Sequence, residues 1–200
     1  MAVATVISGD TIPVDMKVSL KPASTVYPEP VFIIGTYNAD GTPNAMNAAW
    51  GGIANEKRIM VCIDKGHRTA ANLVERGAFT VGIADADNVI ACDYVGIVSG
   101  NDVPDKFARS GLHQTPSDLV DAPVIDELRM TLECKVVSYD TESEMLIGDI
   151  VGIKADESVL TDGKVDPCKL RPITYDPVNR NYHVIGGKVG KAFSDGKELL

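Results

Sequence analysis

The chain is divided into many short apolar, β-branched runs, and this pattern constrains its fold more than any other feature. The first run, residues 31–38, is followed by Asp40-Gly41, a dipeptide typical of a tight hairpin turn, and residues 44–52 are predicted to form the partner strand. Further strands are predicted over residues 59–64, 78–84, 130–139, 145–153 and 182–185. The two strands 130–139 and 145–153 form a pair joined by a polar link, and Asp162-Gly163 marks another turn.

Helical patterns are fewer. Residues 69–76 place Ala70, Leu73 and Val74 on one face, and Gly77 is a typical C-terminal stop. Further helices are predicted over residues 88–95, 104–110 and 189–200, and residues 100–123 form a loop-rich excursion. Many strands with few short helices indicate a mainly β fold, an antiparallel barrel with helical insertions, in one domain spanning residues 1–200.

Composition limits the classes of function. The 200 residues carry a formal net charge of −9, which argues against nucleic acid and anionic membranes as partners. The longest apolar runs are far short of the roughly 20 residues that a membrane helix needs, and the N-terminus lacks a basic signal-peptide segment. The cysteines have no CxxC spacing, so we expect reduced thiols in a cytoplasmic protein and no metal site. They are Cys62, Cys92, Cys134 and Cys168.

A basic cluster lies where the apolar run 59–63 gives way to the predicted helix 69–76. A helix start offers unpaired N–H groups and the positive end of the helix dipole. The side chains added there are those of Lys65, His67, Arg68, Thr69 and Asn72. Their chemistry suits a phosphate group, against the acidic charge of the whole chain. The alternatives are a solvated surface for Arg68, a helix cap for His67 and an ordinary surface amide for Asn72.

The predicted strand 44–52 is rich in alanine and ends at paired glycines. Small residues let a flat ligand lie close to the backbone, whose polar groups then contact its edge, as the edge of a flavin ring would allow. The alternative is a strand packed tightly under a helix. We interpret Trp50 as a residue of the core or of a dimer interface in preference to a ring-stacking partner.

Short motifs along the chain carry further information through their order and spacing. They include Asp40-Gly41 with Asn44-Ala45, Ala49-Trp50, His67-Arg68-Thr69 with Asn72-Leu73, Ser99-Gly100, Asp105-Lys106-Phe107, Gly148-Asp149 and Arg171-Pro172. In this order they resemble the flavin reductase-like family of FMN-binding split barrels, especially its flavoredoxin-like branch. The resemblance covers roughly residues 25–193 and leaves the two termini as extensions.

The resemblance implies an antiparallel Greek-key split β-barrel that forms a homodimer and binds FMN at the interface between the two copies. The cofactor-binding residues that it implies are Met46, Asn47, Ala48, Ala49, Cys62, Ile63, Asp64, Lys65, His67, Arg68, Thr69 and Asn72. Residues 46–49 would follow the isoalloxazine and ribityl chain, Cys62 and Ile63 would border the ring, and the basic cluster would hold the phosphate end. The family pattern also places Ser99, Gly100 and Lys106 near the substrate face.

The function implied is that of an oxidoreductase passing hydride or electrons through FMN to a flavin, a metal ion or a partner protein. The chain lacks the Gly-x-Gly-x-x-Gly fingerprint of a nicotinamide domain, so NAD(P)H would dock transiently. Two alternatives stay open: a flavoredoxin-type electron carrier without NAD(P)H activity of its own, and a non-enzymatic flavin-binding protein. No catalytic residue is assigned, and the sequence leaves the donor and acceptor and the role of His113 undetermined.

Overall fold

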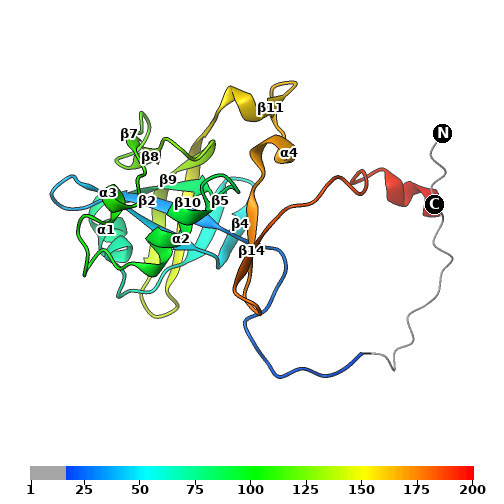
Figure 1. Cartoon of the computed structure of the whole chain (residues 1–200), viewed down its shortest axis with the longest axis horizontal. Coiled ribbons are helices and arrows are strands. Elements are labelled where there is room, and N and C mark those ends of the chain that lie inside the picture. The colour runs from blue at the N-terminus through cyan, green and yellow to red at the C-terminus, as the bar shows by residue number, and fades with distance from the viewer. Residues whose placement is uncertain (1–16) are drawn as a thin grey trace.

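The computed structural model describes residues 17–200, and a curled antiparallel sheet of seven strands forms its centre (Figure 1). In sheet order the strands are β3 (Pro43–Ala48), β2 (Phe32–Tyr37), β6 (Ala78–Ile83), β9 (Met130–Asp140), β10 (Met145–Ala155), β5 (Arg58–Cys62) and β4 (Gly51–Asn55). Every neighbouring pair is antiparallel. The predicted mainly β, antiparallel barrel-type fold is therefore confirmed.

The predicted strand 44–52 is wrong in one respect, because it is two strands at opposite ends of the sheet. Only Ala49 and Trp50 separate β3, the first strand of the sheet, from β4, the last. The chain thus crosses from one sheet edge to the other, and the Trp50 carbonyl accepts from the Cys62 N–H at 2.8 Å. A side chain at Gly51 would meet the Met60 carbonyl at 2.7 Å, so glycine allows the close approach of β4 to β5.

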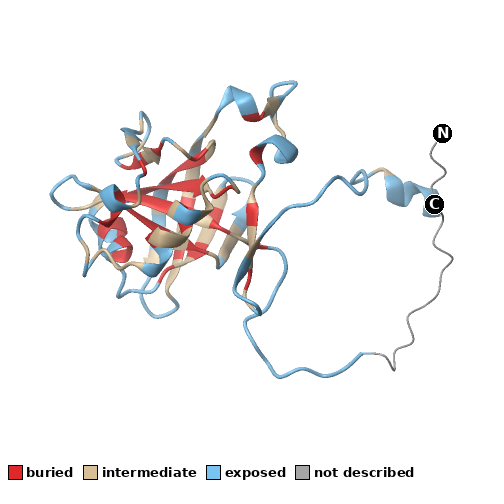
Figure 2. Cartoon of the chain, viewed as in Figure 1, coloured by how far each residue is buried: buried red, intermediate tan, exposed pale blue. Residues whose placement is uncertain are grey.

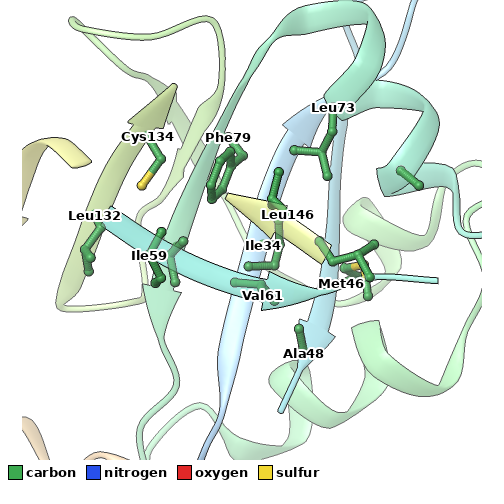
Figure 3. Close-up of a cluster of buried hydrophobic side chains, with 13 residues drawn as sticks. Ile34, Met46, Ala48, Ile59, Val61, Leu73, Phe79, Leu132, Cys134 and Leu146 are labelled. Carbon is green, nitrogen blue, oxygen red and sulfur yellow. The ribbon is translucent and has the colours of Figure 1, made fainter. Parts of the chain in front are cut away.

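Two apolar cores lie on the two faces of the sheet. Because side chains alternate along a strand, the adjacent residues Ile33 and Ile34 of β2 enter different cores, and both are fully buried. Ile34 packs inside the curl of the sheet with Phe79 and Leu146, as Figure 3 shows. Ile33 packs on the other face, in the core that includes Phe107.

The helices are short: α1 (Arg68–Arg76), α2 (Val89–Ile97) and α3 (Lys106–Arg109) pack against the sheet, and α4 (Pro167–Leu170) lies beside residues 157–159. The prediction of α1 is confirmed, and Gly77 ends it in the left-handed conformation with φ of 63°. Leu73 of α1 is buried, but Val74 is 70% exposed, so its predicted place on the buried face was wrong. Successive residues lie about 100° apart around a helix, and the buried stripe continues through the polar residues Thr69 and Asn72 instead.

Several short elements escaped prediction because two to four residues carry no periodic signal. They are β1 (Glu29–Pro30), β13 (Ile173–Asp176), β7 (Gln114–Pro116), β8 (Pro123–Ile125), β11 (Leu160–Thr161), β12 (Lys164–Val165) and the 3₁₀ helix η2 (Glu157–Val159). The predicted last strand is present as β14 (Asn181–Val184), which joins β13 and β1 in a small sheet. The predicted turn at Asp162-Gly163 is confirmed, with φ of 51° and 72° between β11 and β12.

The ends of the described chain lie apart from the barrel and are mostly exposed (Figure 2). The predicted helix 189–200 was wrong in extent, since this segment holds only the 3₁₀ helix η3 (Asp195–Leu199). The four cysteines are free, and burial raises the pKa of Cys92 and of Cys134 to about 12. Within residues 17–200, no helix combines the length and the apolar character needed to span a membrane.

Candidate functional site

A hollow of about 210 Å³ lies between β3, the start of α1 and the segment that joins α2 to α3. Its lining residues are Asn44, Met46, Asn47, His67, Arg68, Thr69, Val95, Gly96, Ile97, Val98, Ser99, Gly100 and Lys106. A second depression of about 370 Å³, here the Tyr182 depression, shares Asn47, Gly96 and Ile97 with the hollow. A third of about 230 Å³ shares Arg68 and Gly100. Because they share lining residues, the three depressions adjoin one another, and we call them together the groove.

A larger depression of about 610 Å³ lies at the turn between β4 and β5, but it is a weaker candidate. Its lining side chains include Arg58 and Asp149, which already form an ion pair at 2.7 Å. Both side chains are more than two-fifths exposed, so the pair is a solvated surface contact. The groove is the better candidate because a helix start and buried polar side chains converge on it.

The start of α1 contributes an open positive end to the hollow. His67 occupies the N-cap position in an extended conformation, but its side chain makes no capping hydrogen bond, so the alternative of His67 as a helix cap is not supported. The first turn holds no acidic residue, and the guanidinium-bearing Arg68 is exposed beside it. The positive end of the α1 dipole and the Arg68 cation therefore act together at this point, and no carboxylate of the first turn neutralises them.

Buried polar side chains form the wall behind the hollow. The amide Nδ2 of Asn44 donates to the hydroxyls of Thr69 at 2.9 Å and Thr36 at 3.2 Å, and Asn72 Nδ2 donates to Thr36 at 3.0 Å. All four residues are at most 2% exposed. The alternative of Asn72 as an ordinary surface amide is therefore wrong, because its amide is part of this wall.

Lys106 fixes the segment that covers the hollow. Its ammonium donates to the carbonyls of Val95 at 3.0 Å and Val98 at 2.8 Å, at the C-terminal end of α2, where a cation is favoured. Lys106 is only 4% exposed, and burial lowers its pKa to about 8. Asn101 Nδ2 donates to the Gly66 carbonyl at 2.9 Å and ties the same segment to the turn before α1.

Glycines in the covering segment allow its close approach to β3 and α1. A Cβ at Gly100 would lie 2.8 Å from Asn44 Oδ1 and 3.2 Å from Arg68 Cβ. A Cβ at Gly96 would lie 2.9 Å from Asn47 Cβ. Larger residues at these two positions would enter the groove or force its walls apart.

The structure brings some of the candidate residues together and leaves others elsewhere. Those at the hollow are Met46, Asn47, His67, Arg68 and Thr69, and Ala49 lines the Tyr182 depression. Those that do not line the groove are Ala48, Cys62, Ile63, Asp64, Lys65 and Asn72. Ala48 and Ile63 belong to the inner core, and Asp64 and Lys65 are exposed in the turn before α1. Cofactor contact stays a prediction for all twelve residues.

The sequence also left residues of the groove unassigned. Asn44 was noted only within a motif, although its amide organises the wall. The Tyr182 hydroxyl donates to Asp93 at 2.8 Å, and burial, followed by this hydrogen bond, raises the Tyr182 pKa. Asn47 Nδ2 donates to the Cys92 carbonyl at 3.2 Å. The only signal for these residues was the order of the family-like motifs, among them Asn44-Ala45 and Asp93-Tyr94, because the residues are distant in the chain.

Comparisons with known proteins give a consistent family and fold. Residues 23–183 match the family model described as flavin reductase like domain. Flavoredoxin of Desulfovibrio vulgaris (Miyazaki F) is 41% identical, with a TM-score of 0.87, and the match covers 90% of this chain and 100% of that one. Flavoredoxin from Methanosarcina acetivorans is 28% identical, with a TM-score of 0.84 and coverage of 92% and 99%.

The fold extends to more distant structures. An FMN-binding domain of a flavin reductases-like enzyme from Shewanella baltica OS155 has a TM-score of 0.73 at 20% identity. The match covers 82% of this chain and 89% of that one. At this identity the likeness concerns the fold alone, which is the split barrel expected from the sequence.

Proposed function

We propose, from the premise that this chain belongs to the flavin reductase-like domain family, that it is an oxidoreductase-type flavoprotein with FMN bound in the groove. Bound FMN supplies hydride or electron transfer, and the protein binds and orients it. The observation that carries the proposal is the uncapped start of α1, where Arg68 and Thr69 face the hollow. These groups match a phosphate in charge and in hydrogen-bond donors.

The donor set and shape of the groove fit FMN. The start of α1 suits the phosphate, and the wall formed by Asn44 and Thr69 suits a hydroxylated chain. At about 210 Å³ the hollow is smaller than the roughly 300 Å³ at the lower end of small-molecule sites. A ligand as large as FMN must therefore extend along the groove, and Ala49 leaves room for a ring in the Tyr182 depression.

We also propose that a second copy of the chain covers this end of the groove. Ile97, which lines both the hollow and the Tyr182 depression, is 73% exposed, and Trp50 beside Ala49 is 59% exposed. The alternative of Trp50 as a core residue is therefore wrong, and a dimer interface remains the proposal for it. Sedimentation velocity tests it, since an apolar interface should keep a dimer intact at about 1 M salt.

Two experiments test the function. The purified chain, incubated with FMN and desalted, should show flavin absorbance bands near roughly 370 and 450 nm. A colourless protein that leaves flavin fluorescence unchanged would overturn the proposal. Anaerobic mixing with NADH or NADPH then separates the candidate activities. Bleaching of the flavin band supports an NAD(P)H oxidoreductase, which we prefer.

Bleaching by dithionite but by neither nicotinamide would support the second candidate, an electron carrier. That candidate is favoured by the 41% identity to a protein named flavoredoxin. Bound flavin that no physiological donor reduces would instead support a non-enzymatic flavin-binding role. Redox partner and acceptor are left open by the proposal.

A further inference from the structure

The outer side of helix α2 is apolar but uncovered. On its inner side Cys92 and Val95 are fully buried, whereas Ile90 is 84% exposed and Ile97 is 73% exposed. The two isoleucines are roughly two helical turns apart, so they lie on the same side of the helix. A helix that is apolar all round is typically covered on every side. The outer side of α2 is therefore a surface that a further element would cover.

The segment after β14 carries exposed apolar side chains away from the barrel. We call residues 186–200 the arm, and Figure 1 shows it extending from the barrel. Just before the arm, the Ile185 N–H donates to the Pro172 carbonyl at 3.2 Å. Beyond this point, the hydrogen bonds that the arm makes within residues 17–200 all stay inside the arm. Val189 is fully exposed and Phe193 is 99% exposed, so the arm does not bury these side chains against its own barrel.

A local turn fixes the aromatic residue of the arm. The Asp195 N–H donates to the Lys191 carbonyl at 3.1 Å, and the Asp195 carboxylate accepts from the Lys191 N–H at 2.6 Å. Phe193 lies between these two residues in the left-handed conformation, with φ of 57°, which a bulky residue rarely adopts. Because such conformations cluster at functional segments, Phe193 is the residue of the arm that we expect to contact a partner.

The arm and the outer side of α2 are complementary in charge as well as in apolar character. Residues 88–104, which contain α2 and the segment after it, include two aspartates and no lysine or arginine. Residues 186–194 of the arm include Lys188 and Lys191 and no acidic residue, against the net charge of −9 of the whole chain. An apolar segment with two cations therefore matches an apolar helix with carboxylates beside it, and charges of this kind favour one partner and one orientation.

We propose that the arm of a second copy lies on the outer side of α2, with Phe193 of one copy packed against Ile90 and Ile97 of the other. One chain carries both members of this pair at separate places, so two copies related by a two-fold axis satisfy both pairs at once. Ile97 lines both the hollow and the Tyr182 depression, so the arm supplies an outer wall of the groove that one chain lacks. The inference rests on the proposed function, which places a second copy over this end of the groove.

The test measures the dimer dissociation constant, by sedimentation velocity over a range of concentrations, for the full chain, Phe193→Ser, Ile90→Ser and the double variant. Burial of a large apolar side chain contributes about tenfold or more in affinity, and each contact occurs twice in a two-fold dimer. Each single variant should therefore raise the dissociation constant at least about 100-fold. The double variant should exceed the larger single effect by about tenfold or less, because both changes remove the same contact. FMN affinity of Phe193→Ser, measured where the unmodified chain is a dimer, should fall at least about fivefold as the outer wall is lost.

Val178→Ser is the matched control, because Val178 is 62% exposed on the turn between β13 and β14, outside the arm and α2. Its dissociation constant should stay within about threefold of that of the unmodified chain. The same small change for Phe193→Ser and Ile90→Ser would overturn the inference and leave the second copy in the proposed function, and an arm folded back on its own α2 would give this result.

Other outcomes separate the parts of the inference. Single effects that multiply in the double variant would overturn the pairing of the arm with α2. Unchanged FMN affinity in a Phe193→Ser chain that has become monomeric would overturn the contribution of the arm to the groove. An unmodified chain that is monomeric at every concentration would remove both the second copy and this inference. The dissociation constants are measured without flavin, so a failure of the proposed FMN binding is a separate result.

Discussion

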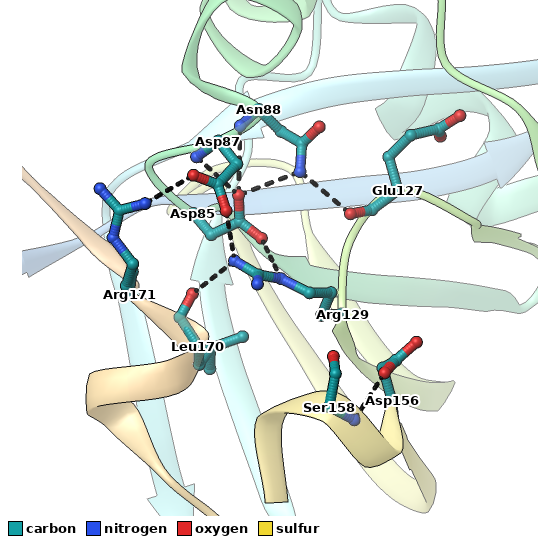
Figure 4. Close-up of polar contacts among 9 residues, drawn as sticks. All are labelled: Asp85, Asp87, Asn88, Glu127, Arg129, Asp156, Ser158, Leu170 and Arg171. Carbon is teal, nitrogen blue, oxygen red and sulfur yellow. Dashed lines mark hydrogen bonds and ion pairs between the residues drawn. The ribbon is translucent and has the colours of Figure 1, made fainter.

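The wall of the hollow and the polar cluster around Asp85 differ in how their polar groups are satisfied. Asp85 is fully buried at the end of β6, and its carboxylate accepts from the N–H groups of Asp87 at 3.0 Å and Asn88 at 3.1 Å (Figure 4). Its other oxygen pairs with Arg129 Nε at 3.2 Å. Both oxygens of the central carboxylate are therefore engaged by donors from the protein itself.

The surrounding side chains complete the cluster around Asp85. Asp87 pairs with Arg129 at 2.9 Å and with Arg171 at 2.6 Å, and Arg129 also donates to the Leu170 carbonyl at 3.1 Å. These contacts join the start of α2 to β9 and to the segment after α4 (Figure 4). The hollow has fewer charges, yet it keeps a helix start without a side-chain cap and the exposed Arg68 available. Unused hydrogen-bonding capacity at a cavity, more than the number of charges, distinguishes a binding site from a structural cluster.

The largest expected effect is on stability and concerns the structural cluster around Asp85. Arg129→Ala leaves the buried Asp85 carboxylate without its cation, which should lower the free energy of unfolding by about 3 kcal/mol. Urea denaturation measures it, and FMN affinity should not change. Arg58→Ala, which removes the exposed pair with Asp149, is the control and should cost less than about 1 kcal/mol. Equal costs for the two variants would contradict the structural role.

The next effect concerns the binding side. Arg68→Ala would remove the charge-assisted hydrogen bond that we propose Arg68 makes to the phosphate of FMN, so FMN affinity should fall roughly 10- to 150-fold, equivalent to about 1.5–3 kcal/mol. Stability should change by less than about 0.5 kcal/mol, because Arg68 is exposed. Lys57→Ala, on the turn before β5, removes the same charge at a distance from the groove. An unchanged FMN titration for Arg68→Ala would count against a phosphate site at α1.

A smaller effect concerns the free-energy cost of burying the Lys106 ammonium beside the hollow. The pKa of Lys106 is lowered from 10.5 to about 8 by burial, so between these pH values the unfolded chain binds more protons than the folded chain. Stability relative to Lys106→Met should therefore rise with pH across this window, by about 1–2 kcal/mol in total. Urea denaturation of both proteins at pH 7, 8, 9 and 10 measures the difference. A difference that stays flat or falls with pH would refute the expectation.

The smallest expected effect concerns a buried hydroxyl, that of Thr131. Within residues 17–200 this hydroxyl has no hydrogen-bond partner, and Thr131 does not line the groove. Thr131→Val should raise the free energy of unfolding by about 0.5–1 kcal/mol and leave FMN affinity unchanged. Thermal and urea unfolding measure it, and a destabilised variant would show that the hydroxyl has a partner.

Most of the fold was predictable because its signals are local. The hairpin at Asp40-Gly41, the paired strands β9 and β10 and the stop of α1 at Gly77 all follow from neighbouring residues. The division of residues 44–52 into β3 and β4 was not predictable, because it depends on how the sheet curls until its two ends meet. The candidate site was predictable in part, through the basic helix start and the motif order.

The sequence by itself determined the strand periodicity, the helix start with its basic residues and the membership of a family. Only the tertiary structure decided that Asn44, Thr69 and Gly100 meet at one hollow and that Asn72 lies behind its wall while Val74 faces solvent. The physical reason is that periodicity depends on residues within a few positions of each other. The hydrogen bonds of the wall join side chains from β2, β3 and α1 that only the folded sheet brings within 3.2 Å.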